Sequence, residues 1–161
     1  MSESGKGRIL VIDDDEGIRK VVAEALKSDG YLVDTATNGK EAVEKSRTNF
    51  YNLALIDIRL PDMEGTKLLT SMKQTIPEMI KIILTGYPAL QNAIDAVNNG
   101  AHGYLVKPIN MDELLRTVEE HLKKQSEMKQ YSQEKVAEFV ETRFNELQTE
   151  EPNSPKATKK E

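Results

Sequence analysis

Three consecutive carboxylates follow the first apolar run of the sequence. These are Asp13, Asp14 and Asp15, and a fourth carboxylate, Asp57, lies inside a later apolar run, where an aspartate is costly to bury without a partner. Two carboxylates about 4 Å apart repel each other by ~1 kcal/mol in water and by several times more near a protein surface. Such a cluster either raises its own pKa values or binds a cation. An all-oxygen site with room for water suits Mg²⁺.

Two further residues that could take part in the same chemistry also follow apolar runs. Thr85 follows one run, and Lys107, which precedes Pro108, follows another. Each residue has an ordinary structural explanation by itself, because acidic residues after a strand commonly begin turns and helices. Together they place carboxylates, a hydroxyl group and an ammonium group at the ends of four apolar runs. We therefore expect them to form one site.

The elements that must position these residues follow two alternating patterns. Short, continuous apolar runs are typical of strands buried on both faces. The runs are Ile9–Ile12, a weaker Tyr31–Ala36, Leu53–Ile58, Ile80–Leu84 and Tyr104–Val106. The segments between them carry apolar residues at three- and four-residue steps, which is typical of helices. Five strand–helix repeats predict an α/β fold whose parallel sheet is covered on both faces.

Residues typical of helix ends separate these segments. Gly30 and Gly100 are placed to end the first and fourth helices, and Pro77 is expected to end the third. Asn38 and Asn110 each precede a glutamate by three residues, which is the spacing of a capping box. In open α/β sheets ligands bind at the carboxyl ends of the strands. The candidate site residues are predicted at that edge.

These segments resemble the receiver domain of two-component response regulators. The resemblance covers residues 7–124 and rests on Ile9–Glu16, Leu55–Gly65, Ile82–Tyr87 and Gly103–Pro108. It implies a flavodoxin-like, doubly wound sheet of five parallel strands in the order 2-1-3-4-5, with five helices. It also implies a cis peptide bond between Lys107 and Pro108.

The resemblance implies a phosphorylation site. Asp57 would be the phosphoacceptor and would share Mg²⁺ with Asp14, which binds the ion directly, and with Asp13, which binds it mainly through water. The backbone carbonyl of Arg59 would be a further metal ligand. Phosphoryl transfer depends mainly on positioning and charge neutralisation, which these groups would supply.

The resemblance also implies a conformational switch. Thr85 and Lys107 would contact the phosphoryl group, and Tyr104 would turn inward once Thr85 has moved. The phosphoryl group would come from a sensor histidine kinase or a phosphotransfer protein, and the switched form would signal to a downstream protein partner. The protein would then catalyse only its own phosphorylation and dephosphorylation.

Two other functions fit parts of the pattern. A haloacid-dehalogenase-type phosphatase would use Asp13 as its nucleophile, but it would leave Asp57 without a role, and no acidic strand end follows Lys107. A flavodoxin-like cofactor binder would need hydroxyl and amide groups after the first strand, where three carboxylates would repel a phosphate. The receiver interpretation accounts for all of these residues.

Composition limits the partners. The chain has 161 residues, with 22 Lys+Arg against 27 Asp+Glu and a net charge of −5, which disfavours direct nucleic-acid binding. The absence of cysteine excludes disulfides and thiolate metal sites. No apolar run approaches the ~18 residues of a membrane helix, and the N-terminus lacks the apolar core of a signal peptide. We therefore expect a cytoplasmic protein.

The chain beyond the receiver segment is predicted to form two parts. Residues 125–149 form an amphipathic helical extension, and residues 150–161, which are polar with two prolines, form a disordered tail. The apolar stripe of the extension consists of Val136, Phe139, Val140, Phe144 and Leu147. It could pack back on the receiver or contact a partner, including a second copy in a homodimer. This remainder is too short for a DNA-binding output domain.

Overall fold

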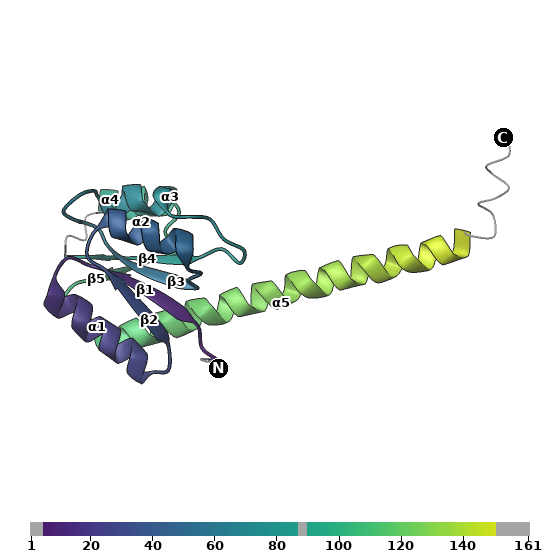
Figure 1. The fold of residues 1–161 in the computed structure, drawn as a ribbon, viewed down its shortest axis with the longest axis horizontal. Helices are drawn as coiled ribbons and strands as arrows, with labels where there is room; N and C mark the ends of the chain where they lie inside the picture. The colour runs from purple at the N-terminus through teal and green to yellow at the C-terminus, as the bar shows by residue number, and fades with distance from the viewer. Residues whose placement is uncertain (1–4, 87–89, 151–161) are drawn as a thin grey trace. The chain divides into compact units, whose positions relative to one another are not determined.

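Five strands and five helices alternate along the part of the chain that the structure describes (Figure 1). The computed structural model describes residues 5–86 and 90–150, apart from the side chains of residues 90–93 and 149–150. The strands are β1 (Arg8–Ile12), β2 (Leu32–Ala36), β3 (Leu53–Asp57), β4 (Ile80–Thr85) and β5 (Gly103–Val106). The helices are α1 (Glu16–Ser28), α2 (Gly39–Thr48), α3 (Gly65–Ser71), α4 (Leu90–Asn98) and α5 (Met111–Glu150). The predicted disordered tail lies outside the described residues from residue 151 onward.

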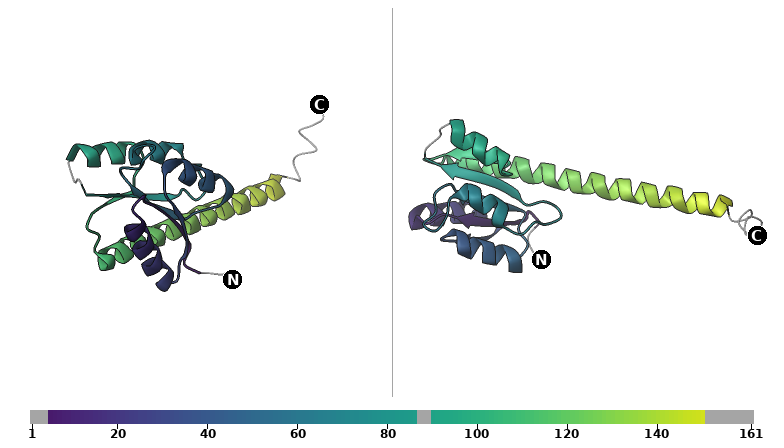
Figure 2. Two further views of the ribbon diagram at one scale, coloured as in Figure 1. Left: turned by 60° about the vertical axis from the view of Figure 1, so that its left-hand side comes forward. Right: turned by 90° about the horizontal axis from the view of Figure 1, so that it is seen from above.

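The strands form one parallel sheet in the order β2-β1-β3-β4-β5. Helices cover both faces of the sheet, with α1 and the first part of α5 on one side and α2, α3 and α4 on the other (Figures 1 and 2). This arrangement confirms the doubly wound α/β fold and the strand order. Parallel sheets covered in this way have buried strands, which is why the strand sequences are apolar runs rather than alternating patterns.

Two apolar cores lie on the two faces of the sheet. Alternate residues of β1 point to opposite sides, so that Ile9 and Val11 join α1 and α5, whereas Leu10 and Ile12 join α2 and α3. The residues that α1 and α5 bring to the first core are Val22, Leu26, Leu114, Val118 and Leu122. All five residues of β3 are buried, Asp57 included, so the central strand is rigidly held on both faces.

The ends of the helices agree with most of the sequence predictions. Asn38 and Asn110 accept hydrogen bonds from the third backbone N–H group beyond them, at 2.8 and 2.9 Å. Gly30 and Gly100 have φ angles of 100° and 103°, in the left-handed region that favours glycine.

The prediction for the end of the third helix was wrong. Helix α3 ends at Ser71 rather than near Pro77, because Met72 adopts an extended conformation and is buried in the core. The next residue, Lys73, donates its backbone N–H to the Ser46 hydroxyl on α2. Helix α3 thus ends at the point where Met72 enters the core, five residues before Pro77.

Helix α5 is one uninterrupted helix of 40 residues. The polar stretch between the receiver segment and the apolar stripe is helical, since it contains neither Gly nor Pro and consists mostly of good helix formers. The chain divides into two units, with the division between Gln125 and Ser126. Among the described residues, no helix has the length and apolar character needed to cross a membrane.

Candidate functional site

The sheet register brings the predicted site residues to one edge. Ile12 pairs with Ile56, so the next residues on these strands, Asp13 and Asp57, lie side by side. On the other side of β3, Asp57 itself pairs with Leu84, so Thr85 is one residue further along. Thr85 in turn pairs with Val106, which precedes Lys107. Four strand ends therefore supply the edge, as the sequence predicted.

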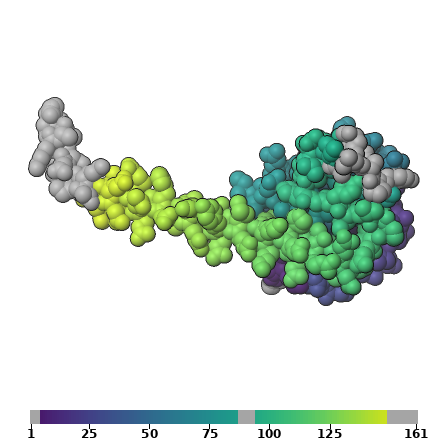
Figure 3. All heavy atoms as spheres, turned by 180° about the vertical axis from the view of Figure 1, so that it is seen from behind, coloured from purple at the N-terminus to yellow at the C-terminus, as the bar shows by residue number. Residues whose placement is uncertain are grey.

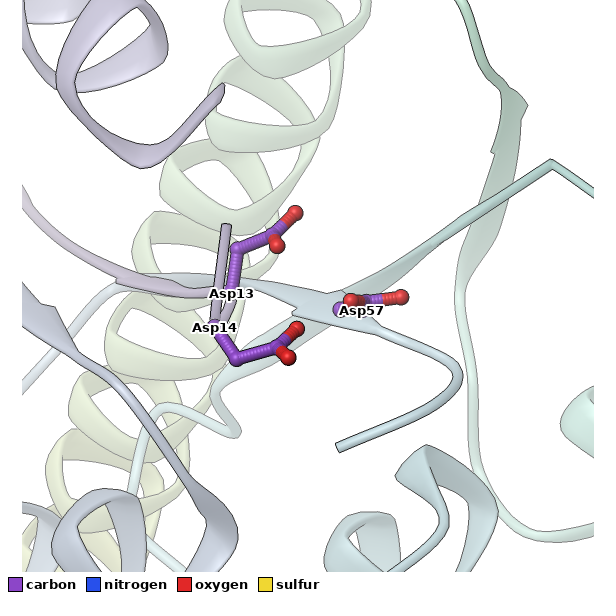
Figure 4. Close-up of side chains that lie close together, drawn as sticks. All are labelled: Asp13, Asp14 and Asp57. Atoms are coloured by element: carbon purple, nitrogen blue, oxygen red, sulfur yellow. The ribbon is translucent and has the colours of Figure 1, made fainter. Parts of the chain in front are cut away.

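Three carboxylates converge at this edge (Figure 4). Asp13, Asp14 and Asp57 each offer a carboxylate oxygen within 4.8 Å of the others. Asp13 is fully buried and Asp57 is 7% exposed, whereas Asp14 is open to solvent. The two buried groups therefore cannot rely on water to screen their charges.

Lys107 brings a positive charge to the two buried carboxylates. Its Nζ atom lies 3.0 Å from Oδ2 of Asp13 and 3.6 Å from Oδ1 of Asp57. The peptide bond between Lys107 and Pro108 is cis, as the family resemblance implied. A single ammonium group facing three carboxylates leaves an excess of negative charge, which a bound cation would offset.

The charges at this edge shift the pKa values of Asp57 and Lys107. Burial raises the pKa of Asp57 to about 6, Asp13 adds to the rise, and the Arg59 N–H and Lys107 oppose it. Burial by itself would lower the pKa of Lys107, but the carboxylates of Asp13 and Asp57 outweigh it and raise that pKa above its usual value. Lys107 is therefore a fixed positive charge, and Asp57 is a carboxylate whose charge is poorly stabilised by its surroundings.

The loop after β3 is folded closely around Asp57. The backbone N–H of Arg59 donates to Oδ1 of Asp57 at 3.2 Å, and Gly65 donates to the carbonyl of Ile58 at 2.7 Å. A Cβ atom added to Gly65 would lie 2.6 Å from the Asp57 carbonyl oxygen and 2.9 Å from Cα of Ile58. Only glycine allows this approach of backbone to backbone.

Thr85 and Tyr104 lie on the neighbouring strands β4 and β5. Thr85 is fully buried at the end of β4, and its carbonyl accepts a 2.7 Å hydrogen bond from the Lys107 backbone. Tyr104 pairs with Ile83 on β4, and its ring packs against the core under α2, α3 and α4. Its hydroxyl is buried and has no hydrogen-bond partner among the described residues.

The sequence matches the response regulator receiver domain over residues 9–119. The chain belongs to this family. The receiver fold is shared with a CheY-like receiver domain protein from Methanospirillum hungatei, which is 42% identical, with a TM-score of 0.72 over 75% of this chain and 97% of that one. A second similar structure is the beryllofluoride-activated NtrC4 receiver domain dimer, which is 30% identical, with a TM-score of 0.69 over 73% of this chain and 98% of that one.

Longer proteins also contain a similar receiver domain. The transcriptional regulatory protein ZraR of Klebsiella oxytoca is 38% identical over 114 residues, which are 71% of this chain and 26% of ZraR. The chain therefore spans about a quarter of the length of the curated relatives it matches. Receiver domains are signalling domains, and this similarity identifies the signalling module rather than the activity of the longer proteins.

The acidic edge of this receiver domain fits a hard divalent cation. The donors are carboxylate oxygens from Asp13, Asp14 and Asp57, close enough together to share one ion. Asp14 is exposed, which leaves room for the water ligands that Mg²⁺ usually keeps.

Three positioning residues of the receiver site were not predicted. Asp15 donates its backbone N–H to Oδ1 of Asp13 at 2.9 Å, and its own carboxylate caps α1 through the N–H of Ile18. Arg19 donates to the Asp13 carbonyl at 2.8 Å. The carboxylate of Asp62 accepts from the N–H groups of Gly39 and Lys40 and so joins the loop after β3 to α2.

The sequence carried a signal for only some of these positioning residues. An acidic residue directly before a helix indicates an N-cap, so the role of Asp15 could have been found. The contacts of Arg19 and Asp62 depend on residues that come together only in the fold.

Proposed function

We propose that this receiver domain accepts a phosphoryl group on Asp57 from a histidine kinase or a phosphotransfer protein, in a reaction that requires Mg²⁺. The observation that carries the proposal is the position of Lys107, whose ammonium group lies between the carboxylates of Asp13 and Asp57. Of the three carboxylates, Asp57 combines burial, a raised pKa and a place at the centre of the sheet. These features suit a nucleophile that is poorly solvated and held in one position.

The transfer step needs an ionised Asp57. A carboxylate oxygen of Asp57 attacks the phosphorus of a phosphohistidine, a new P–O bond forms, and the P–N bond breaks with its electron pair going to the imidazole. Because the pKa of Asp57 is about 6, most of the group is ionised at neutral pH. Lys107 offsets part of the negative charge on the phosphoryl oxygens, which carry most of the charge in the transition state.

The metal would be held by Asp13, Asp14, Asp57 and the backbone carbonyl of Arg59. When bound, Mg²⁺ would neutralise charge on the phosphoryl oxygens. The protein's part is to hold the two buried carboxylates together against their mutual repulsion. The backbone N–H of Asp15 and the ammonium group of Lys107 bind Asp13, and the same ammonium group pairs with Asp57.

We further propose that phosphorylation changes the environment of Thr85 and Tyr104. The phosphoryl group adds a charge of about −1.5 to −2 and three strong acceptors beside Asp57. The Thr85 hydroxyl would donate to one of these acceptors, and its movement would change the space available to Tyr104. The hydroxyl of Tyr104, which has no hydrogen-bond partner within the described part of the chain, supports this role, since a buried polar group without a partner favours an alternative arrangement. A downstream protein partner would read the altered surface of α4, β5 and α5.

A protein donor needs a contact surface beside the carboxylates. A cavity of about 440 Å³ opens next to Lys107 and Asp15 and is lined mainly by apolar side chains of α1 and of the loop after β5. The apolar lining residues are Ile18, Val21, Val22, Pro108, Ile109 and Met111. Val21 is 53% exposed, which is high for a valine on a helix that covers a sheet. This surface suits an apolar side chain from the donor, and a donor of this kind implies a cytoplasmic location.

Labelling with a small phosphodonor tests the proposal. Incubation with acetyl phosphate and Mg²⁺ should give an adduct that survives acid and is released by hydroxylamine, as an acyl phosphate is. Asp57→Asn should give none, and chelation of the metal should suppress labelling of the unaltered protein. Normal labelling of Asp57→Asn, combined with none for Asp13→Asn, would refute the proposal and favour a phosphatase that uses Asp13.

A further inference from the structure

The second unit of the chain exposes an apolar stripe on one helix face. The residues of this 136–147 stripe are Val136, Phe139, Val140, Phe144 and Leu147, and each is more than half exposed. They belong to the part of α5 that runs from green to yellow in Figure 3. Five large apolar side chains on three turns of one helix form a contiguous patch rather than scattered surface residues. Such a patch indicates an interaction surface.

Four of the five stripe residues keep their spacing when the helix is read backwards, and the mirror position of the fifth, Val140, is occupied by Arg143. Positions 136, 139, 140, 143, 144 and 147 are symmetric about the point midway between residues 141 and 142. An antiparallel pair of identical helices centred on that point would place Val136 opposite Leu147 and Phe139 opposite Phe144. Apart from Val140, which would face Arg143, the stripe is therefore complementary to itself in the antiparallel direction, as a two-fold interface requires.

Charged residues favour the same direction. Arg143 occupies the one polar position of the symmetric set. In a parallel pair in register a residue at the centre of the interface faces its own copy, so a parallel pair centred on this set would bring two Arg143 side chains together. In the antiparallel pair Arg143 faces Val140 instead, and its own Glu146, at 2.6 Å, remains its ion partner.

Lys135 and Glu146 add a complementary pair. They are separated by three helical turns and so flank the stripe on the same side. In an antiparallel pair the same flank of each helix faces its counterpart, so Lys135 of one copy comes near Glu146 of the other. Along the helix axis, Lys135 of one copy and Glu146 of the other would then be about 3 Å apart, a distance that these long side chains can span.

We propose that the 136–147 stripe binds a second copy of this chain, with the two helices antiparallel. The proposal does not depend on phosphorylation of Asp57, because every residue in it lies in the second unit. An isolated helix of a few turns, such as the one that carries the stripe, is marginally stable in water. A partner helix would therefore also stabilise this part of α5. An interface of only three helical turns on each chain buries a small area. We therefore expect a weak dimer that exchanges with the monomer rather than a permanent dimer.

Sedimentation of the full chain over a range of concentrations tests for the dimer. The apparent mass should rise from 18.1 kDa toward twice that value. Phe139→Ser should weaken the dimer by about tenfold or more, because it truncates an aromatic residue at the centre of the interface. Tyr131→Ser is the matched control, since Tyr131 is also an aromatic residue that is more than half exposed but lies on another face of the same helix, and it should leave the dimer unchanged. A chain that remains monomeric at every concentration, or a dimer insensitive to Phe139→Ser, would overturn the proposal.

Cysteine cross-linking tests the direction, in a chain that has no cysteine of its own. We expect a mixture of Val136→Cys and Leu147→Cys, one of them carrying a size tag, to form the mixed disulfide on oxidation. Each variant alone should cross-link poorly, because in the antiparallel pair residue 136 and its copy are roughly 16 Å apart along the helix. Efficient cross-linking of Val136→Cys with itself would show a parallel pair and would overturn the proposed geometry.

Discussion

The ammonium nitrogen of Lys107 lies 3.6 Å from Oδ1 of Asp57, although the two residues come from strands that are not neighbours in the sheet. Strand β4 separates them, and Lys107 reaches across its end. The contact only partly offsets the cost of burying Asp57, because the pKa of that carboxyl is still raised to about 6. The site therefore keeps a poorly stabilised charge, which is a common feature of functional sites.

Replacement of Asp57 should stabilise the metal-free protein. We expect Asp57→Asn to raise the free energy of unfolding in EDTA at neutral pH by about 1–3 kcal/mol, since each pKa unit corresponds to ~1.4 kcal/mol and the site can relax in part. The folded protein binds more protons than the unfolded chain between the ordinary pKa of aspartate and about 6. The stability of the unaltered protein should thus fall as the pH rises through this window, and the advantage of Asp57→Asn should be complete above it. Urea unfolding at pH 4.5 and pH 7.5 measures both effects.

Asp14→Asn is the control for this experiment. It removes a carboxylate of the same cluster, but Asp14 is exposed and solvated, so the gain in stability should be smaller. Equal unfolding midpoints for Asp57→Asn and the unaltered protein at pH 7.5 would show that the buried charge carries no such cost. Addition of Mg²⁺ should reduce the difference between them, because the unaltered site binds the ion more tightly.

Removal of the Lys107 charge should raise the pKa of Asp57 further. In Lys107→Gln the carboxylates of Asp13 and Asp57 lose their shared cation, so the Asp57 titration should move above about 6. A ¹³C NMR titration of the aspartate carboxyl groups in EDTA would follow this change. Lys67→Gln, at an exposed position on α3, serves as the control and should leave the titration in place. An unchanged Asp57 titration in Lys107→Gln would mean that the 3.6 Å contact has little electrostatic weight.

The sequence was a good guide to the strands and to the carboxylates. Continuous apolar runs mark buried parallel strands, and the residues that follow such runs must lie at one edge of the sheet. For that reason the sequence could place Asp13, Asp57 and Lys107 at one site. Only the structure shows that the ammonium group of Lys107 lies 3.0 Å from the Asp13 carboxylate.

The remaining features depend on contacts between distant segments. Helix α3 ends where Met72 is buried in the core, but the local sequence contains no stop signal stronger than Pro77, so the sequence predicted a later end. Asp62 caps α2 from more than twenty residues away, so its role has no sequence spacing that could reveal it. Local patterns thus predicted the elements and the site, but not the contacts that fix the loop after β3.

Replacement of Gly65 should distort the loop that holds Asp57. The new Cβ of Gly65→Ala would meet the Asp57 carbonyl and Cα of Ile58, and because both are backbone atoms neither can simply rotate away. We expect a loss of about 1–3 kcal/mol of stability, with slower labelling by acetyl phosphate. Gly86→Ala is the control, since a Cβ there meets no atom of the described residues within 4 Å. If Gly65→Ala were labelled by acetyl phosphate at the normal rate, the close packing of Gly65 against the Asp57 backbone would not be needed for phosphorylation.

The His102 side chain should make the domain less stable under mildly acidic conditions. Its Nδ1 atom accepts a 3.0 Å hydrogen bond from the Lys81 backbone, which requires the unprotonated nitrogen. Burial lowers the pKa of His102, Lys81 and His121 lower it further, and Glu78, 3.8 Å from Nε2, opposes them. The unfolded chain therefore binds the proton more readily, and this contribution to stability is present above about pH 6.5 and lost as the pH falls toward the folded pKa.

His102→Asn isolates this effect, because the asparagine oxygen can accept the same hydrogen bond but does not titrate. The difference in unfolding free energy between the unaltered protein and His102→Asn should shift against the unaltered protein as the pH falls from 7.5 to 5.5. Contributions from other groups cancel in this comparison, since they are common to both proteins. His121→Asn removes the other of the two histidines, and it should keep most of the pH dependence of His102, losing only the small part of the lowered pKa that comes from His121. A pH-independent difference for His102→Asn would show that His102 titrates alike in the folded and unfolded chains.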